Sequence, residues 1–121
     1  MSAPTLPAPL VLASASTARA RMLQAAGVPL EIIPAKVDEA EMKLALRHQG
    51  ADTEAAAIAL AELKALQVSR AYPGRLVLGA DQMLDCDGRW FDKPEDRAAA
   101  REQLLLLRDR GHRLTSAAVL A

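Results

Sequence analysis

Short apolar runs alternate along the chain with longer stretches in which apolar residues recur at helical spacing. Short runs bounded by turn residues are typical of buried strands, and apolar residues three and four positions apart are typical of one buried helix face. We predict strands at 9–13, 30–35, 75–80, 83–86, 89–91 and 114–120. We predict helices at 17–26, 39–49 and 95–110, and from 52 or 53 to 71. Strands alternating with helices predict an α/β fold, with helices layered over a sheet.

Capping and turn residues support several of these boundaries. Ser16 is a suitable N-cap for the first helix, and Gly27 followed by Pro29 should end it. The pair Asp87-Gly88 lies between two short apolar runs, which is the strongest hairpin signal in the chain. The local pattern therefore predicts where the chain turns as well as where it is regular.

Composition narrows the class of protein. The chain has 121 residues, 51% of them hydrophobic and 2% aromatic, so one domain with a core of aliphatic residues and alanine is expected. The formal net charge is zero, which gives no long-range attraction to nucleic acid or to an anionic membrane. Aromatic side chains for stacking on bases are also scarce. We therefore expect neither a nucleic-acid polymer nor a membrane as partner.

The cysteine count and the first residues bear on the compartment. Cys86 is the only cysteine, so no intrachain disulfide can form, which suits a reducing environment. The first nine residues contain three prolines and no cationic stretch before an apolar run, so they do not resemble a signal peptide. We expect a cytoplasmic protein.

The segment from Leu12 to Arg19 combines a strand, a turn of small residues and a helix start. A helix N-terminus offers free N–H groups and the positive end of the helix dipole, so it can bind a phosphate. Ser14 and Ser16 would add hydroxyl groups, and the Arg19 guanidinium would add charge-assisted hydrogen bonds. The segment alone fits a capped helix followed by a solvated arginine better than a phosphate site, and both interpretations stay open at this point.

A second group, Gly79-Ala80-Asp81-Gln82, spans the end of the run at 75–80, so that Asp81 directly follows the predicted strand. The carboxyl ends of strands are where open α/β sheets bind their ligands. A carboxylate there could hold a divalent metal or take a proton from water. The alternative is that Asp81 only opens a turn.

Three further charged residues have both a functional and a structural interpretation. Lys93 precedes Pro94, which we place in the first turn of the helix 95–110. A cation at a helix start is unfavourable for the helix dipole, which hints at a phosphate contact, although a surface loop lysine is as plausible.

Glu39 follows Asp38, an expected N-cap, and could face a metal. Lys64 lies on the long helix, whose apolar stripe should include Ile58, Ala61 and Ala65, and alone it is typical of a solvated lysine.

Taken in order, these segments resemble the Maf family. The motifs are Leu-Ala-Ser-x-Ser-x-x-Arg, Val-Asp-Glu, Ala-x-x-Lys-Ala, Gly-Ala-Asp, and an acidic-Gly turn before Lys-Pro. They stand here at 12–19, 37–39, 61–65, 79–81 and 87–94. Each motif alone is weak, but five in this order are specific, and the resemblance covers the chain from about residue 10 to its end.

The resemblance implies a fold, a reaction and a set of roles. It implies a mixed sheet between helical layers, related to the inosine triphosphate pyrophosphatases, of which this chain would be the N-terminal part. It implies hydrolysis of a nucleoside triphosphate to the monophosphate and pyrophosphate with a divalent cation, Mg²⁺ or Mn²⁺. Asp81 would be the catalytic acid/base and Glu39 would help to hold the metal with it. The triphosphate would be held by four residues: Ser14, Arg19, Lys64 and Lys93.

Two departures from the family pattern concern the base of the substrate. The family often has proline followed by arginine or tryptophan where this chain has Thr17 and Ala18, a position linked to base choice. At the position after the family's catalytic aspartate, this chain has Gln82, whereas the pyrimidine-specific branch usually has threonine. A glutamine there is more similar to the branch that acts on 7-methyl-GTP. Ala18 and Gln82 are therefore the predicted specificity residues.

The last expectation concerns residues 114–120, a mostly apolar segment that we interpret as a strand buried in the sheet. Family members continue well beyond this point, so residues 1–121 are expected to be one Maf-like domain shortened at its C-terminal end. An apolar surface left open there predicts a homodimer or aggregation. The alternative to an enzyme is a catalytically impaired module that binds a nucleotide or a partner, linked to cell division.

Overall fold

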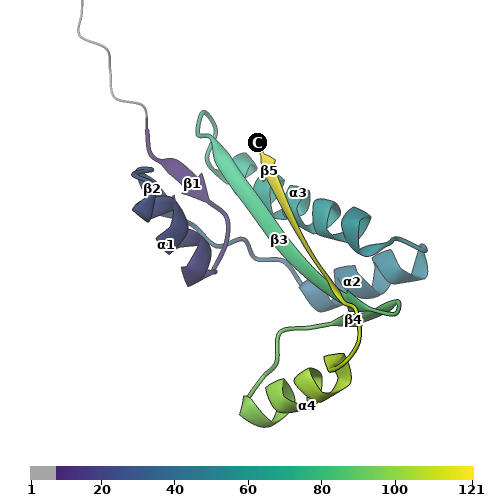
Figure 1. The fold of residues 1–121 in the computed structure, drawn as a ribbon. Helices are drawn as coiled ribbons and strands as arrows, with labels where there is room; N and C mark the ends of the chain where they lie inside the picture. Colours follow the sequence, from purple (N-terminus) through teal and green to yellow (C-terminus); the bar gives the residue numbers. More distant parts are fainter. Residues whose placement is uncertain (1–7) are drawn as a thin grey trace, which may run out of the picture.

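Residues 8–121 are described by the computed structural model, in which strands and helices alternate along the chain (Figure 1). The expectation about a signal peptide concerns mainly residues 1–7, which lie outside the described residues. The elements are β1 (Leu10–Leu12), α1 (Thr17–Ala25), β2 (Leu30–Ile32), α2 (Glu39–His48), α3 (Thr53–Ala71), β3 (Val77–Cys86), β4 (Arg89–Phe91), α4 (Arg97–Leu107) and β5 (Arg113–Leu120). None of these helices is long and apolar enough to cross a lipid bilayer.

β3 is the central strand of a mixed sheet. The strand order is β2-β1-β3-β4, and β5 also pairs with β3. β1 runs parallel to β2 and to the start of β3, whereas β4 and β5 run antiparallel to β3. Leu78 pairs with both β1 and β5, and Leu84 pairs with both β4 and β5. β1 and β4 therefore share one edge of β3, and β5 occupies the other, so the predicted layered mixed sheet is confirmed.

α3 covers one face of the sheet and approaches it most closely at Gly79. A Cβ atom on Gly79 would lie 2.2 Å from the carbonyl oxygen of Ala61 and 2.8 Å from the Cβ atom of Ala65. Glycine on the strand and alanine on the helix therefore let the two backbones pack without intervening side chains. Figure 1 shows α3 lying along the length of β3 and β5.

Most of the core lies between α3 and the sheet. The largest fully buried side chains are Leu12, Leu60, Met83, Val11 and Val77. The predicted apolar stripe of the long helix is right at Ala61 and Ala65 but wrong at Ile58, which is exposed. The buried face of the helix differs from the predicted one, because the close contact at Gly79 points Ala61 and Ala65 directly at the sheet.

β3 corrects the prediction of two separate strands at 75–80 and 83–86. It runs without a break from Val77 to Cys86, and Asp81 and Gln82 pair with Ala117 and Ser116 of β5. Asp81 therefore lies in the middle of a strand and not at its carboxyl end, and the alternative that it opens a turn is also wrong. The polar pair interrupts the apolar run without interrupting the strand, because β5 supplies backbone partners there.

Local capping and turn signals agree with the structure at most positions. Ser16, Asp38 and Asp52 are the N-caps of α1, α2 and α3, and each side chain accepts a hydrogen bond from a backbone N–H of the first helical turn. Asp87 and Gly88 have φ angles of 52° and 81°, which are the positive values that a two-residue hairpin turn requires. The predicted N-cap at Ser16 and the predicted hairpin are confirmed.

Outside β3, three boundaries differ from the prediction by two or three residues. β2 ends at Ile32, so residues 33–35 are not strand. α4 begins at Arg97 with Asp96 as its N-cap, which leaves Pro94 outside the helix. α4 also ends at Leu107, earlier than predicted, and Asp109 adopts a positive φ of 57° after it. The Asp96 side chain accepts from the N–H of Ala99, and this cap takes the place of the expected proline start.

β5 corrects the expectation of a strand buried in the sheet. Within residues 8–121 it pairs with β3 alone, and its side chains alternate between partly buried and exposed. Leu114 and Leu120 are exposed because they face away from α3, which covers only the other face. The apolar residues of this segment therefore line an open sheet surface.

Candidate functional site

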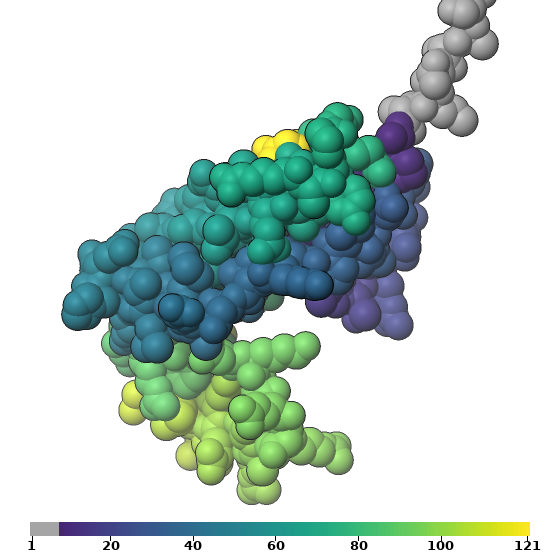
Figure 2. Space-filling model, turned by 180° about the vertical axis from the view of Figure 1, so that it is seen from behind, coloured from purple at the N-terminus to yellow at the C-terminus, as the bar shows by residue number. Residues whose placement is uncertain are grey.

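A cleft of about 730 Å³ collects the residues that the sequence singles out. It lies between the N-terminal end of α1, the first residues of α2, the middle of α3 and β3, and the segment that joins β4 to α4. Figure 2 shows the molecule hollowed between its purple and blue part and the green β4–α4 part. The predicted site residues that line the cleft are Ser14, Ala18, Arg19, Glu39, Lys64, Asp81, Gln82 and Lys93.

The loop after β1 is fixed by hydrogen bonds to its own hydroxyl groups. Ser14 Oγ accepts from the backbone N–H of Ser16 at 3.2 Å and from Arg19 Nη1 at 3.0 Å. The same Nη1 also donates to the carbonyl oxygen of Ala80, at 3.4 Å. The arginine is therefore partly buried and fixed beside β3, so the interpretation as a solvated residue is wrong. The helix is capped as expected, and its N-terminus and Arg19 open onto one cleft.

Asp81 is a buried carboxylate with one ionic partner. Its side chain is 7% exposed and that of Lys64 is 12% exposed, and Asp81 Oδ1 lies 3.2 Å from Lys64 Nζ. Lys64 also forms an ion pair with Glu39. The ammonium group thus lies between two carboxylates from different elements, which compensates the cost of burying charge. The interpretation of Lys64 as a solvated helix lysine is wrong.

Asp81 has an oxygen atom with no protein partner. Within residues 8–121, Oδ2 is buried and accepts no hydrogen bond. A buried carboxylate oxygen without a donor is costly, so such an atom usually serves water, a metal or a substrate. No cluster of three or more acidic, histidine or cysteine side chains forms in the described part of the chain. Asp81 and Glu39 nevertheless fit Mg²⁺, which binds through one or two carboxylates and completes its shell with waters and phosphate oxygens.

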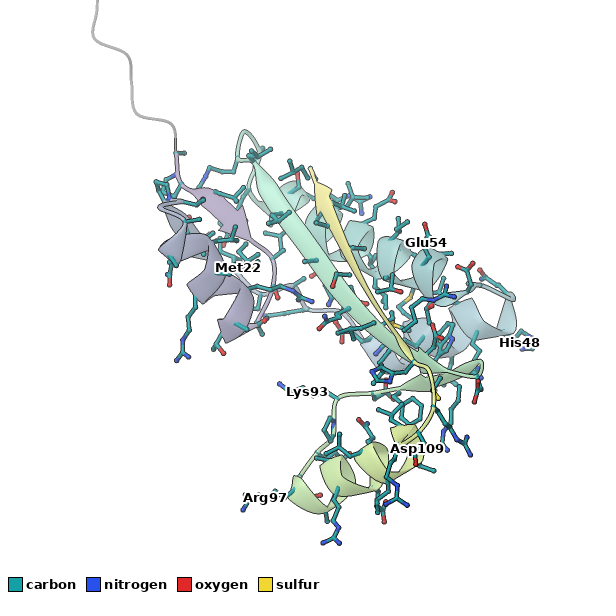
Figure 3. All side chains as sticks on the ribbon, in the orientation of Figure 1. Met22, His48, Glu54, Lys93, Arg97 and Asp109 are labelled. Carbon is teal, nitrogen blue, oxygen red and sulfur yellow. The ribbon has the colours of Figure 1, made fainter. Side chains whose placement is uncertain are left out.

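Lys93 reaches the same cleft from the opposite side. It lies in the segment between β4 and α4, three residues before the N-cap Asp96, so the argument from an unfavourable helix dipole does not apply to it. Its side chain is exposed and takes part in none of the ion pairs found within residues 8–121. Figure 3 shows Lys93 extending away from α4 toward the α1 side of the molecule.

Ala18 and Gln82 mark the boundary between this cleft and a second hollow. The second hollow measures about 450 Å³ and is mainly apolar, with Leu78, Ala117 and Ala118 among its lining residues. Gln82 Nε2 lies 3.3 Å from Ser116 Oγ across the β3–β5 pair. Ala18, Arg19, Asp81 and Gln82 line both hollows, so a ligand could place a charged part in one and an apolar part in the other.

Sequence reasoning missed three polar residues that line the two hollows: Lys43, Gln103 and Ser116. Lys43 follows Glu39 by four residues, so the two share one helix face, and this spacing could have pointed to it. Gln103 and Ser116 come from α4 and β5, and no pattern in their own segments distinguishes them. Their position depends on how these elements pack.

This layered α/β domain has a cleft that joins a helix N-terminus, several cations and a buried carboxylate, and these are features that phosphate-binding sites share. The family model described as Maf-like protein matches residues 9–121. The chain belongs to the Maf family.

Proteins similar to this chain carry related names. A protein of Paramagnetospirillum magneticum named nucleoside triphosphate pyrophosphatase is 56% identical over 109 residues, covering 90% of this chain and 56% of the relative. One of Granulibacter bethesdensis with the same name is 50% identical, covering 93% and 57%. A 7-methyl-GTP pyrophosphatase of Mesorhizobium japonicum is 47% identical, covering 92% and 56%. The chain thus spans little more than half the length of the curated relatives it matches.

Removal of Lys64 should destabilise the fold, because it leaves the buried charge of Asp81 uncompensated. We expect Lys64→Met to lower the free energy of unfolding by about 3 kcal/mol, because it leaves a buried carboxylate without its charge partner. The double variant Lys64→Met with Asp81→Asn should recover most of that loss. Chemical denaturation measures both. Lys36→Met, at an exposed lysine, is the matched control and should stay within about 0.5 kcal/mol of the parent. Equal stability of Lys64→Met and the parent would contradict the buried ion pair.

Proposed function

We propose that this chain carries the phosphate-binding and catalytic part of a nucleoside triphosphate pyrophosphatase. The observation that carries the proposal is the buried Asp81, with one oxygen bound to Lys64 and the other without a donor, facing a cleft rich in cations. Arginine and lysine in the cleft outnumber its acidic residues, with Arg19, Lys43, Lys64 and Lys93 against Glu39, Asp81 and Asp92. A triphosphate supplies the negative charge that such a surface attracts.

Asp81 is the general base of the proposed reaction. Its free oxygen accepts a proton from a water molecule, whose oxygen then attacks the α-phosphorus. The bond between the α-phosphorus and the bridging oxygen to the β-phosphate breaks, and pyrophosphate leaves. Negative charge shifts toward the leaving group during this step, so cations along the β- and γ-phosphates accelerate it.

The remaining site residues bind and orient the triphosphate. Ser14 and the N-terminus of α1 donate hydrogen bonds to phosphate oxygens, and Arg19 adds its guanidinium. Lys93 contributes an exposed cation from the far side of the cleft. Asp81 and Glu39 would hold a divalent cation, Mg²⁺ or Mn²⁺. When bound, it would neutralise phosphate charge.

The base of the substrate is proposed to be sensed at Gln82 and Ala18. Both residues lie where the polar cleft meets the mainly apolar hollow, and a flat base suits an apolar surface with few polar groups. The name of the Mesorhizobium japonicum relative, 7-methyl-GTP pyrophosphatase, supports a modified purine as one candidate substrate. The other relatives' names leave the base open.

The cytoplasmic location and the homodimer stay predictions. Cys86 is free and buried, in keeping with a reducing compartment. The exposed apolar residues of β5 support self-association, which sedimentation would measure. The alternative of an impaired binding module stays open as well, and turnover distinguishes it from an enzyme.

Pyrophosphate is the expected product. Incubation with a panel of nucleoside triphosphates and Mg²⁺ or Mn²⁺, followed by chromatography, should yield monophosphate and pyrophosphate in equal amounts. In water labelled with ¹⁸O, the label should enter the monophosphate, because the attack falls on the α-phosphorus. Orthophosphate with a nucleoside diphosphate as the main products would contradict the assignment.

The role of Asp81 has a direct test. Asp81→Asn keeps the shape of the side chain but cannot take a proton, so turnover should fall by about 100-fold or more, whereas triphosphate binding should persist. Glu62→Gln removes an exposed carboxylate of α3 and is the matched control. Steady-state kinetics and calorimetric titration measure the two effects. Turnover of Asp81→Asn within about tenfold of the parent would exclude Asp81 as the base.

A further inference from the structure

α2 presents one line of charged side chains to the rest of the molecule. Glu39, Lys43 and Arg47 are spaced by four residues and therefore share a helix face. Glu39 forms an ion pair with Lys64 inside the cleft. At the other end of the line, Arg47 donates to the carbonyl oxygen of Gly88, at 3.1 Å, in the β3–β4 turn. α2 thus connects Lys64 of α3 with the hairpin that leads to Lys93.

The middle residue of this line, Lys43, binds the segment that carries Lys93. Lys43 Nζ lies 3.0 Å from Asp92 Oδ1, and Asp92 is the neighbour of Lys93 in the chain. The Lys43 side chain is 21% exposed and that of Asp92 is 80% exposed. The lysine is therefore the fixed partner of the pair, and the exposed aspartate is held by it. Gln103 of α4 donates to the backbone carbonyl oxygen of Asp92. Asp92 is therefore held from two sides by residues that both line the cleft.

The two contacts on Asp92 restrict a segment that has little other support. Phe91 ends β4 and α4 begins only at Arg97, so residues 92–96 lie between the two regular elements. Among the described hydrogen bonds and ion pairs, none involves the Lys93 side chain itself. The direction of Lys93 therefore depends on how its neighbour is held.

We propose that Lys43 is a positioning residue, which acts through Asp92 to hold Lys93 over the triphosphate. The inference rests on the proposed function, because it assigns Lys93 a phosphate to meet. An ion pair with one exposed partner contributes little to stability, so its effect should appear in substrate affinity and not in the melting temperature. The ion pair with Asp92 allows positioning to be distinguished from direct phosphate binding. If Lys43 bound the phosphate directly, loss of the Asp92 carboxylate would release its ammonium group and raise the affinity for the triphosphate. If Lys43 acts through Asp92, the same loss would leave Lys93 unpositioned and lower that affinity.

The test compares Lys43→Met, Lys43→Arg, Asp92→Asn and the double variant Lys43→Met with Asp92→Asn. We expect Lys43→Met and Asp92→Asn each to raise KM for the triphosphate about fivefold to tenfold and to leave kcat within about twofold, since the weakened contact of Lys93 is made equally in the ground state and in the transition state. The double variant should be no worse than either single variant, because both break one contact. Lys43→Arg should restore most of the affinity. Lys36→Met is the control lysine and should match the parent.

A second readout is independent of the reaction. Amide hydrogen exchange in the nucleotide-free protein should show faster exchange at residues 91–96 in Lys43→Met and in Asp92→Asn, with the rest of the chain unchanged. If the parent turns over no triphosphate, the proposed function fails, and this exchange still decides whether Lys43 holds the segment. Unchanged exchange in both variants would overturn the positioning role. A raised KM in Lys43→Met with a lowered KM in Asp92→Asn would overturn it too, and would make Lys43 a direct phosphate ligand.

Discussion

The close contact between α3 and β3 at Gly79 determines where the candidate catalytic residues lie. A side chain on Gly79 would overlap the backbone of Ala61, and a larger residue than alanine at position 65 would push the helix away. Lys64 lies between these alanines on the helix, and Asp81 follows Gly79 by two residues, on the same face of the strand. The ion pair between Lys64 and Asp81 is therefore a consequence of how closely the two backbones pack.

This arrangement has an energetic cost that the site uses. Asp81 is buried with one oxygen unsatisfied, and each buried polar atom without a partner destabilises the fold by about 1–3 kcal/mol. The charge of Lys64 offsets part of that cost, and the tightly packed core beneath holds both groups in place. A carboxylate that lacks a donor in the free protein is ready to bind water or a cation. The chemistry proposed for the cleft depends on that unsatisfied oxygen.

Local signals predicted much of the fold because they act over a few residues. Ser16 as an N-cap and the Asp87-Gly88 turn depend only on their immediate neighbours, and both predictions were right. The continuity of β3 could not be predicted in this way. Asp81 and Gln82 stay in the strand because β5, more than thirty residues away along the chain, supplies their hydrogen-bond partners.

The candidate site was predictable in its members but not in its contacts. The family motifs gathered Ser14, Arg19 and Lys93, and the structure places them around one cleft. The contact of Lys43 with Asp92 joins residues 49 positions apart, and no motif includes it. Contacts of this kind depend on the packing of α2 against the hairpin, which a sequence pattern does not encode.

The position of the candidate site depends most directly on the packing at Gly79, which one pair of variants can test. Gly79→Ala should lower the free energy of unfolding by about 1–3 kcal/mol through overpacking, and should weaken triphosphate binding at temperatures where the protein stays folded, because α3 and Lys64 move away from Asp81. Gly111→Ala is the matched control, since a Cβ atom there meets nothing within 4 Å, and it should resemble the parent in both measurements. If Gly79→Ala unfolds and binds triphosphate as the parent does, the close contact does not position the site and the central claim is wrong.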